Sequence, residues 1–200
     1  MAVILWGVAR CALTDKLLEE TDDIVCFPPF ATDFDDPLYL YHDNCVLREA
    51  FDRCEHHEAI LARFHEFMRQ CCATRPSWHL FLDEDEYMVE WGGMSTIRLV
   101  FTNHAFTLDV YQPNWRAFRR AFSQASRTGT STCQIGNRTI SIQVGQDEVQ
   151  ISRLDRSTDG TAFRDRILIS QREWERLLEI LKEVDEKLLP KMDKASKARR

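Results

Sequence analysis

The stretch ILISQREWERLL, residues 167–178, decides the fold of the last third of the chain. The apolar run Ile167 to Ile169 is typical of a short strand. Ser170 stands where a helix cap is expected, and Glu173 follows three residues later, which completes a capping-box pattern. The helix that starts here carries an apolar side, formed by Trp174, Leu177, Leu178, Leu181, Val184 and Leu188.

Further strands are expected upstream of this helix. Residues rich in turn formers occupy 145–147 and 157–160. Apolar and polar residues alternate around the first turn, with Ile140, Ile142, Val144, Val149 and Ile151 as the apolar members. We therefore predict that residues 131–190 form a module of short antiparallel strands followed by a helix.

A similar plan precedes this module. Residues 78–126 contain alternating apolar runs that predict a strand meander, and then apolar residues at helical spacing. A strand, a Gln and a Trp recur in the same order in 108–118 and in 167–177. The sequence therefore predicts an internal duplication, with a degenerate sheet-plus-helix module at 77–127 and a polar linker at 127–131.

The first 76 residues have a different character. We expect a buried strand at residues 2–6, an acidic loop that contains prolines, and one long helix or two between Val46 and Met68. Pro76 marks the end of the helix, because the residue before a proline disfavours helical geometry. The expected fold class is therefore α+β, with two tandem modules of short antiparallel sheet followed by a helix, preceded by a mainly helical N-terminal region.

Charge is unevenly distributed along the chain. The formal net charge is -6, which argues against binding to phosphates. Acidic residues concentrate at 19–36, at 83–86 and on the final helix, whereas 127–166 carries six arginines. The last ten residues, 191–200, predict a flexible basic tail. A local basic face therefore stays compatible with the acidic total.

The cysteines and the hydropathy pattern indicate the setting of the protein. Seven cysteines form an odd set with no regular framework, so we expect reduced thiols in an intracellular protein. No apolar run reaches the roughly 18 residues that cross a bilayer, and residues 2–6 lack the flanks of a signal peptide.

The last third of the chain resembles a known family. The run 133–138, the strands after it, the Asp159-Gly160 turn and the segment 167–188 match, in order and spacing, the C-terminal domain of the transcriptional coactivator family positive cofactor four. The resemblance covers residues 132–189 and extends weakly to 78–126. It implies a four-stranded antiparallel sheet with a C-terminal helix, dimerisation, and binding to single-stranded DNA in transcription or in genome replication and maintenance. It also implies a nuclear location, and the duplicated layout hints at a viral or lineage-specific member.

A site follows from this resemblance and from the physics of single strands. Unpaired bases expose their faces, so a curved sheet can hold them with arginines for phosphates and an aromatic ring for stacking. The candidate residues are Arg138, Arg153, Arg156, Phe163, Arg164 and Arg166. The chain departs from the family at Arg156-Ser157, where an aromatic residue is usual, and in a shorter, less basic turn after it.

The apolar side of the final helix is wider than one small sheet needs, which suggests a partner helix. Either the helix at 114–125 pairs with it inside one chain, or a second chain forms a homodimer there. We expect Trp115 and Trp174 to pack in the core rather than stack on bases.

Three alternatives compete with nucleic-acid binding. His42, Cys45, Cys54 and His57 resemble a zinc ligand set, but the spacing is short and Cys54 lies on an apolar helical stripe. The acidic clusters suggest metal-dependent phosphoryl chemistry, but no catalytic motif accompanies them. A structural or dimerisation protein that keeps the fold without nucleic-acid binding is the third alternative. We expect no cofactor, no metal and no enzymatic activity.

Overall fold

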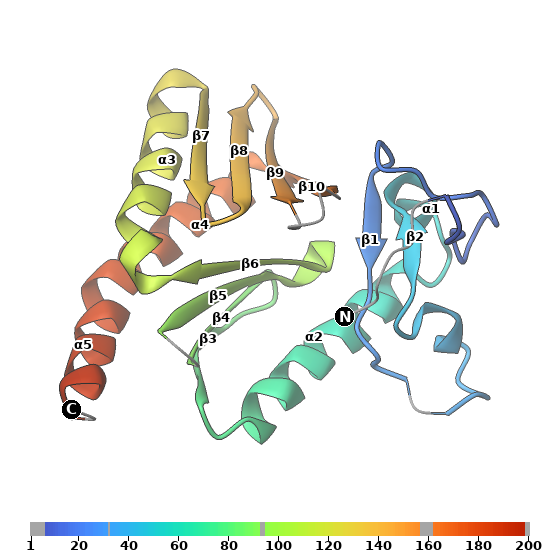
Figure 1. Ribbon diagram of the computed structural model, residues 1–200, viewed down its shortest axis with the longest axis horizontal. Helices are drawn as coiled ribbons and strands as arrows, with labels where there is room; N and C mark the ends of the chain where they lie inside the picture. The colour runs from blue at the N-terminus through green and yellow to red at the C-terminus, as the bar shows by residue number, and fades with distance from the viewer. Residues whose placement is uncertain (1–6, 32, 93–94, 157–161, 199–200) are drawn as a thin grey trace.

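Alternating apolar residues in the middle and last thirds of the chain form two four-stranded antiparallel sheets (Figure 1). The computed structural model describes residues 7–31, 33–92, 95–156 and 162–198. The expected strand at 2–6 and the turn at 157–160 lie outside the described residues.

Each of the two sheets is followed along the chain by a helix. The first sheet has the strand order β3-β4-β5-β6 and the second has the order β10-β9-β8-β7. The first sheet and its helix comprise β3 Trp78–Asp83, β4 Tyr87–Gly92, β5 Thr96–Phe101, β6 Phe106–Tyr111 and α3 Trp115–Thr128. The second comprises β7 Thr130–Ile135, β8 Arg138–Val144, β9 Glu148–Arg156, β10 Ala162–Ser170 and α4 Gln171–Glu183.

The chain between α3 and β7 is shorter than the sequence suggests. The predicted linker at 127–131 is wrong, because α3 continues to Thr128 and β7 begins at Thr130. Gly129, with φ +79°, ends the helix in the left-handed conformation that glycine adopts without strain. Strand β10 is also longer than the expected run Ile167 to Ile169, since it pairs with β9 from Ala162 to Ser170.

The inner faces of the two sheets share one core. Val89 and Leu99 of the first sheet belong to the same buried cluster as Ile140 and Ile151 of the second. Strands of the second sheet run across those of the first (Figure 1). We call the sides that meet in this core the inner faces, and the opposite sides the outer faces.

The helix after β10 begins as the sequence predicts. The Ser170 side chain accepts a hydrogen bond from Glu173 N, and the Glu173 side chain accepts one from Ser170 N. The helix runs on through a π-helical turn, η4 Val184–Leu188, into α5 Leu189–Ala198. The basic tail predicted at 191–200 is therefore helical as far as residue 198, and Met192 is buried in the core.

The N-terminal region is not mainly helical, which corrects the expectation for residues 1–76. In its described part, the α-helices are α1 Arg48–Asp52 and α2 His57–Thr74, and a two-stranded sheet joins β1 Ile24–Cys26 to β2 Cys45–Leu47. Val46 fits the helical spacing but pairs with Val25 in this sheet. Short 3₁₀ turns complete the elements: η1 Tyr39–Tyr41, η2 Thr102–His104 and η3 Gln112–Asn114.

The expectation of reduced thiols is wrong for two cysteines. Cys26 and Cys45 lie opposite each other in the β1-β2 ladder and form a disulfide. The sequence hides this pair, because only the antiparallel register brings the two residues together. No helix in the described part of the chain combines the length and the apolar character that crossing a membrane requires.

Candidate nucleic-acid interface

The strand register divides the predicted site residues between the two faces of the second sheet. Arg138 pairs with Asp155, and Ile140 with Arg153, so these side chains share the inner face with Ile140. Arg156, Arg164 and Arg166 occupy the alternate positions and lie on the outer face.

Phe163 lies in β10, where the register pairs it with Asp155. Its side chain lies outside the described residues, so its stacking on a base stays a prediction.

The two inner arginines join the sheets to each other. Arg153 Nη1 donates to Thr107 O at 2.6 Å, and Arg138 Nη1 donates to Asp109 O at 3.4 Å. Both carbonyls belong to β6, one of the two edge strands of the first sheet. The guanidinium groups therefore satisfy backbone acceptors that no neighbouring strand reaches. We expected Arg138 and Arg153 to lie on one surface with the other arginines, and this is wrong. Side chains alternate between the two faces of a strand, so these two lie on the inner face and the other three on the outer face.

A buried charge network surrounds Arg153. Asp165 is 5% exposed, and its carboxylate lies 3.1 Å from Arg48 Nη2 and 3.5 Å from Arg153 Nη2. Burial raises the pKa of Asp165, and the two guanidinium groups oppose this rise. Arg48 comes from α1, so this network also fastens the N-terminal region to the second sheet.

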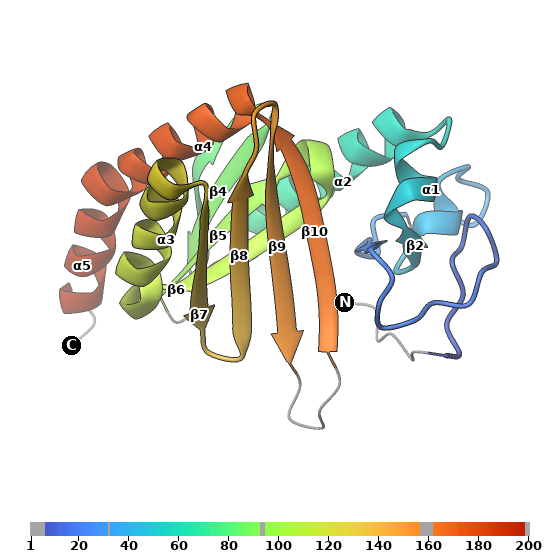
Figure 2. The ribbon, with the colours of Figure 1, turned by 90° about the horizontal axis from the view of Figure 1, so that it is seen from above.

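The outer face of the second sheet has no buried residue among its described side chains. In Figure 2 this sheet faces the viewer, and no element lies in front of it. Uncharged polar side chains form most of its surface: Thr130, Thr132, Gln134, Thr139, Ser141, Gln143, Gln150 and Ser152. We call this set the polar floor. Sequence reasoning missed it, although its residues alternate with the apolar ones that revealed the strands.

The three outer arginines lie at the β9–β10 side of the polar floor. Arg166 Nε lies 2.5 Å from Asp23 Oδ2, while the Arg166 side chain stays half exposed. Arg156 and Arg164 are exposed and form no ion pair with any residue that the structure describes. Their positive charge is therefore available to an anionic ligand.

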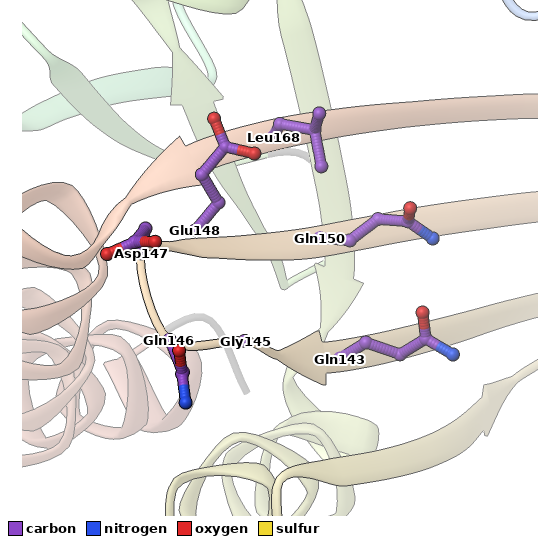
Figure 3. A pocket seen from close by; sticks show the side chains of 7 residues that line it. All are labelled: Gln143, Gly145, Gln146, Asp147, Glu148, Gln150 and Leu168. Atoms are coloured by element: carbon purple, nitrogen blue, oxygen red, sulfur yellow. The ribbon is translucent and has the colours of Figure 1, made fainter.

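A shallow groove of about 550 Å³ lies where the polar floor meets the β8–β9 turn (Figure 3). Gln143, Gln150 and Leu168 form a row across three neighbouring strands, because the register pairs Gln150 with each of the other two. Leu168 is 49% exposed and offers an apolar surface beside the two amides. Asp147 and Glu148 line the end of the groove. The groove can therefore take a flat, polar-edged group such as a base, whereas its acidic end disfavours phosphate.

The outer face of the first sheet is covered. Met88 and Val100 are fully buried there, in one cluster with Ile60 and Phe64 of α2. Glu90, on the same face, is 1% exposed and pairs with Arg98 at 3.5 Å. Of the two outer faces, the one on the second sheet is thus the surface that a ligand can reach.

The apolar side of the final helix is covered within the chain. Trp174, Leu177, Leu181, Val184 and Leu188 are buried in the shared core, and Leu178 packs at its margin. Phe122 of α3 stacks on Trp174 with ring centroids 5.5 Å apart. Trp115 is also buried, and its Nε1 donates to Asp185 Oδ1 at 2.5 Å. The helices α3 and α4 therefore pack against each other within the chain.

The zinc and phosphoryl-transfer alternatives gain no geometric support. Cys45, one member of the candidate zinc set, is bonded to Cys26. Among the described residues, no three His, Cys, Asp or Glu side chains lie together as metal ligands. In the acidic cluster at 83–86, Asp83 pairs with His65 and Arg69, and Glu84 pairs with Arg176.

Comparison with known proteins adds no assignment. No model of a protein family matches the chain, and no curated protein matches it with significance.

Proposed function

We propose that the protein binds single-stranded DNA, without reading its sequence, on the outer face of the second sheet. The observation that supports this most directly is the uncovered polar floor with Arg156, Arg164 and Arg166 at one side. Such a surface suits a strand whose phosphates meet guanidinium groups while its bases lie over hydroxyls and amides. A duplex hides the base faces, so the single strand is the favoured form.

The resemblance to positive cofactor four is the second support. It implies four antiparallel strands and a following helix for residues 132–189, and β7 to β10 with α4 have that order. We propose that the first sheet with α3 is a degenerate copy of the same module, whose outer face α2 has taken over. The biological setting that we propose is transcription or genome replication and maintenance, in the nucleus.

The test is the salt dependence of binding to oligo-dT, measured by fluorescence anisotropy. Each phosphate contact on a single strand contributes about 0.7 to the slope of log affinity against log salt. The triple variant Arg156→Ala, Arg164→Ala, Arg166→Ala should therefore lower the slope by at least about 1.4, because Arg156 and Arg164 have no ion-pair partner among the described residues whereas Arg166 is already paired with Asp23. A matched variant, Arg172→Ala, Lys182→Ala, Lys194→Ala, removes the same charge from exposed positions on α4 and α5 and should leave the slope unchanged.

Two results would overturn the proposal. One is the absence of any retention of oligo-dT at low salt, and the other is equal binding by the wild type and the arginine triple variant. Circular dichroism of each variant checks that the sheets still form. The absence of retention would favour the alternative, a protein that keeps the paired fold as an interaction module and has no nucleic-acid face, whereas equal binding would show that the strand binds elsewhere on the protein.

A further inference from the structure

Helix α3 is basic in a chain that is acidic overall. Its sequence, WRAFRRAFSQASRT, contains four arginines and no Asp or Glu, whereas the formal net charge of the protein is -6. Arg116, Arg120 and Arg127 are exposed. Their spacing of four and seven residues places them on one side of the helix, opposite Phe118 and Ala125 in the core. We call these three residues the α3 arginine row.

The charge of this row is not neutralised by its surroundings. The remaining arginine of the helix, Arg119, pairs with Asp185 at 2.9 Å. Arg127 Nε donates to the backbone oxygen of Ser123, which leaves its positive charge in place. Arg116 and Arg120 have no ion-pair partner within the described ranges of the chain.

Helix α3 lies along one side of the second sheet. It runs beside β7, the edge strand, in both views of the molecule (Figures 1 and 2). Two hydrogen bonds hold it there, from Ser131 Oγ to Ala121 O at 2.6 Å and from Thr128 Oγ1 to Thr130 O at 2.8 Å. The second sheet therefore lies between two elements that carry arginines, β10 with Arg164 and Arg166, and α3 with the arginine row.

The helix in the equivalent place of the other half has the opposite charge. Helix α4 carries four glutamates and three basic residues in the sequence QREWERLLEILKE, so its side chains sum to a formal charge of -1. Glu179 pairs with Arg176, and Glu183 pairs with Lys187. An acidic helix repels a phosphate backbone, whereas α3 attracts one. This difference in charge favours binding of an anionic chain on the side of the molecule where α3 lies.

We propose that the α3 arginine row is a second phosphate-binding rim, so that a single strand crosses the sheet from β10 to α3. This inference rests on the proposed function. The axes of the two edge strands lie about 14 Å apart, because three spacings of about 4.8 Å separate neighbouring strands. A short oligonucleotide therefore occupies the β10 side of the floor alone, and a longer one reaches both rims.

The experiment compares two lengths of oligo-dT, about 4 and about 16 nucleotides, which bracket common single-strand site sizes. The variant Arg116→Ala, Arg120→Ala, Arg127→Ala should lower the salt slope by about 2 for the long oligonucleotide, which corresponds to three lost phosphate contacts. It should leave the slope for the short one unchanged. The matched variant on α4 and α5, described above, should change neither slope.

The outcomes separate this inference from the function on which it rests. An unchanged slope with the long oligonucleotide, when the β9–β10 triple variant still lowers it, would overturn the second rim and keep the binding function. An equal loss for both lengths, or an equal effect of the control variant, would also overturn the rim. A wild-type protein that binds neither oligonucleotide would overturn both proposals.

Discussion

The outer faces of the two four-stranded sheets differ in burial: the first is covered by other elements and the second is exposed. On the first sheet, Met88 and Val100 are buried beneath α2 and the N-terminal region, and the charged residues there are paired. On the second sheet, the alternate positions carry mainly hydroxyls, amides and three arginines, together with Glu148, Leu154 and Leu168, and no described side chain is buried. A protein with two similar sheets can thus bury one outer face and leave the other exposed, because residues on an outer face can change without disturbing the inner core.

The largest expected effect comes from placing a charge on each face. Val100→Asp puts a carboxylate into the fully buried cover of the first sheet, and we expect a loss of at least about 4 kcal/mol in the free energy of unfolding. Ser141→Asp, on a central strand of the second sheet, should cost about 1 kcal/mol or less. Urea unfolding followed by circular dichroism measures both. Similar losses would mean that the second outer face is covered as well.

The disulfide between Cys26 and Cys45 closes a loop with a sequence separation of 19 in the N-terminal region, and Cys45 belongs to the cluster that buries Met88 and Val100. The double variant Cys26→Ser, Cys45→Ser should lose about 3 kcal/mol, because the unfolded chain regains the entropy of that loop. Hydrogen exchange should accelerate in β1, β2 and α1 and stay slow in β8 and β9.

Treating the wild type with a reductant provides the control, since it should reproduce the behaviour of the double variant. The prediction would be contradicted if loss of the disulfide accelerated hydrogen exchange more in β8 and β9 than in β1, β2 and α1.

Glu173 joins the two halves of the molecule. It completes the capping box of α4, and its Oε1 lies 3.0 Å from Nε2 of His104, which belongs to the first half. Partial burial favours a higher pKa, but hydrogen bonds from His104 and Ser170 outweigh it and lower the pKa to about 2. Glu173→Gln should cost about 1–2 kcal/mol at neutral pH.

The pH dependence follows from the sign of this shift. Since the folded pKa lies below the ordinary value of 4.5, the stabilisation is present above pH 4.5 and disappears as the pH falls towards 2. Glu173→Gln should therefore show a shallower loss of stability over this interval than the wild type. Glu175→Gln, at an exposed position on the same helix, is the control and should keep the wild-type slope.

The smallest expected effect on stability concerns Leu168, which is 49% exposed beside the groove. Leu168→Ala should reduce the free energy of unfolding by about 1 kcal/mol or less, because little apolar surface leaves water there on folding. Its neighbour Ile167 is fully buried, and Ile167→Ala should cost several times more. Thermal unfolding compares the two variants. A large loss for Leu168→Ala would show that another element packs on the outer face.

Much of the local structure could be predicted because its causes are local. The capping box at Ser170, the helix end before Pro76 and the period-two strands depend on residues that are close in sequence. The placement of the arginines could not be predicted to the same degree. Arg153 and Arg156 lie three residues apart in one strand, and the odd spacing sends their side chains to opposite faces. The period separates the two arginines, but which of the two faces is covered depends on how the sheets pack.

The sequence by itself determined the α+β class, the paired strand-and-helix plan of residues 78–189 and the apolar side of the final helix, since hydrophobic periodicity and capping are properties of short segments. The tertiary structure alone decided which outer face is covered, that Cys26 meets Cys45, and that Arg138 and Arg153 bind the edge of β6. These features depend on contacts between segments far apart in the chain, and no local pattern encodes the docking of one element on another.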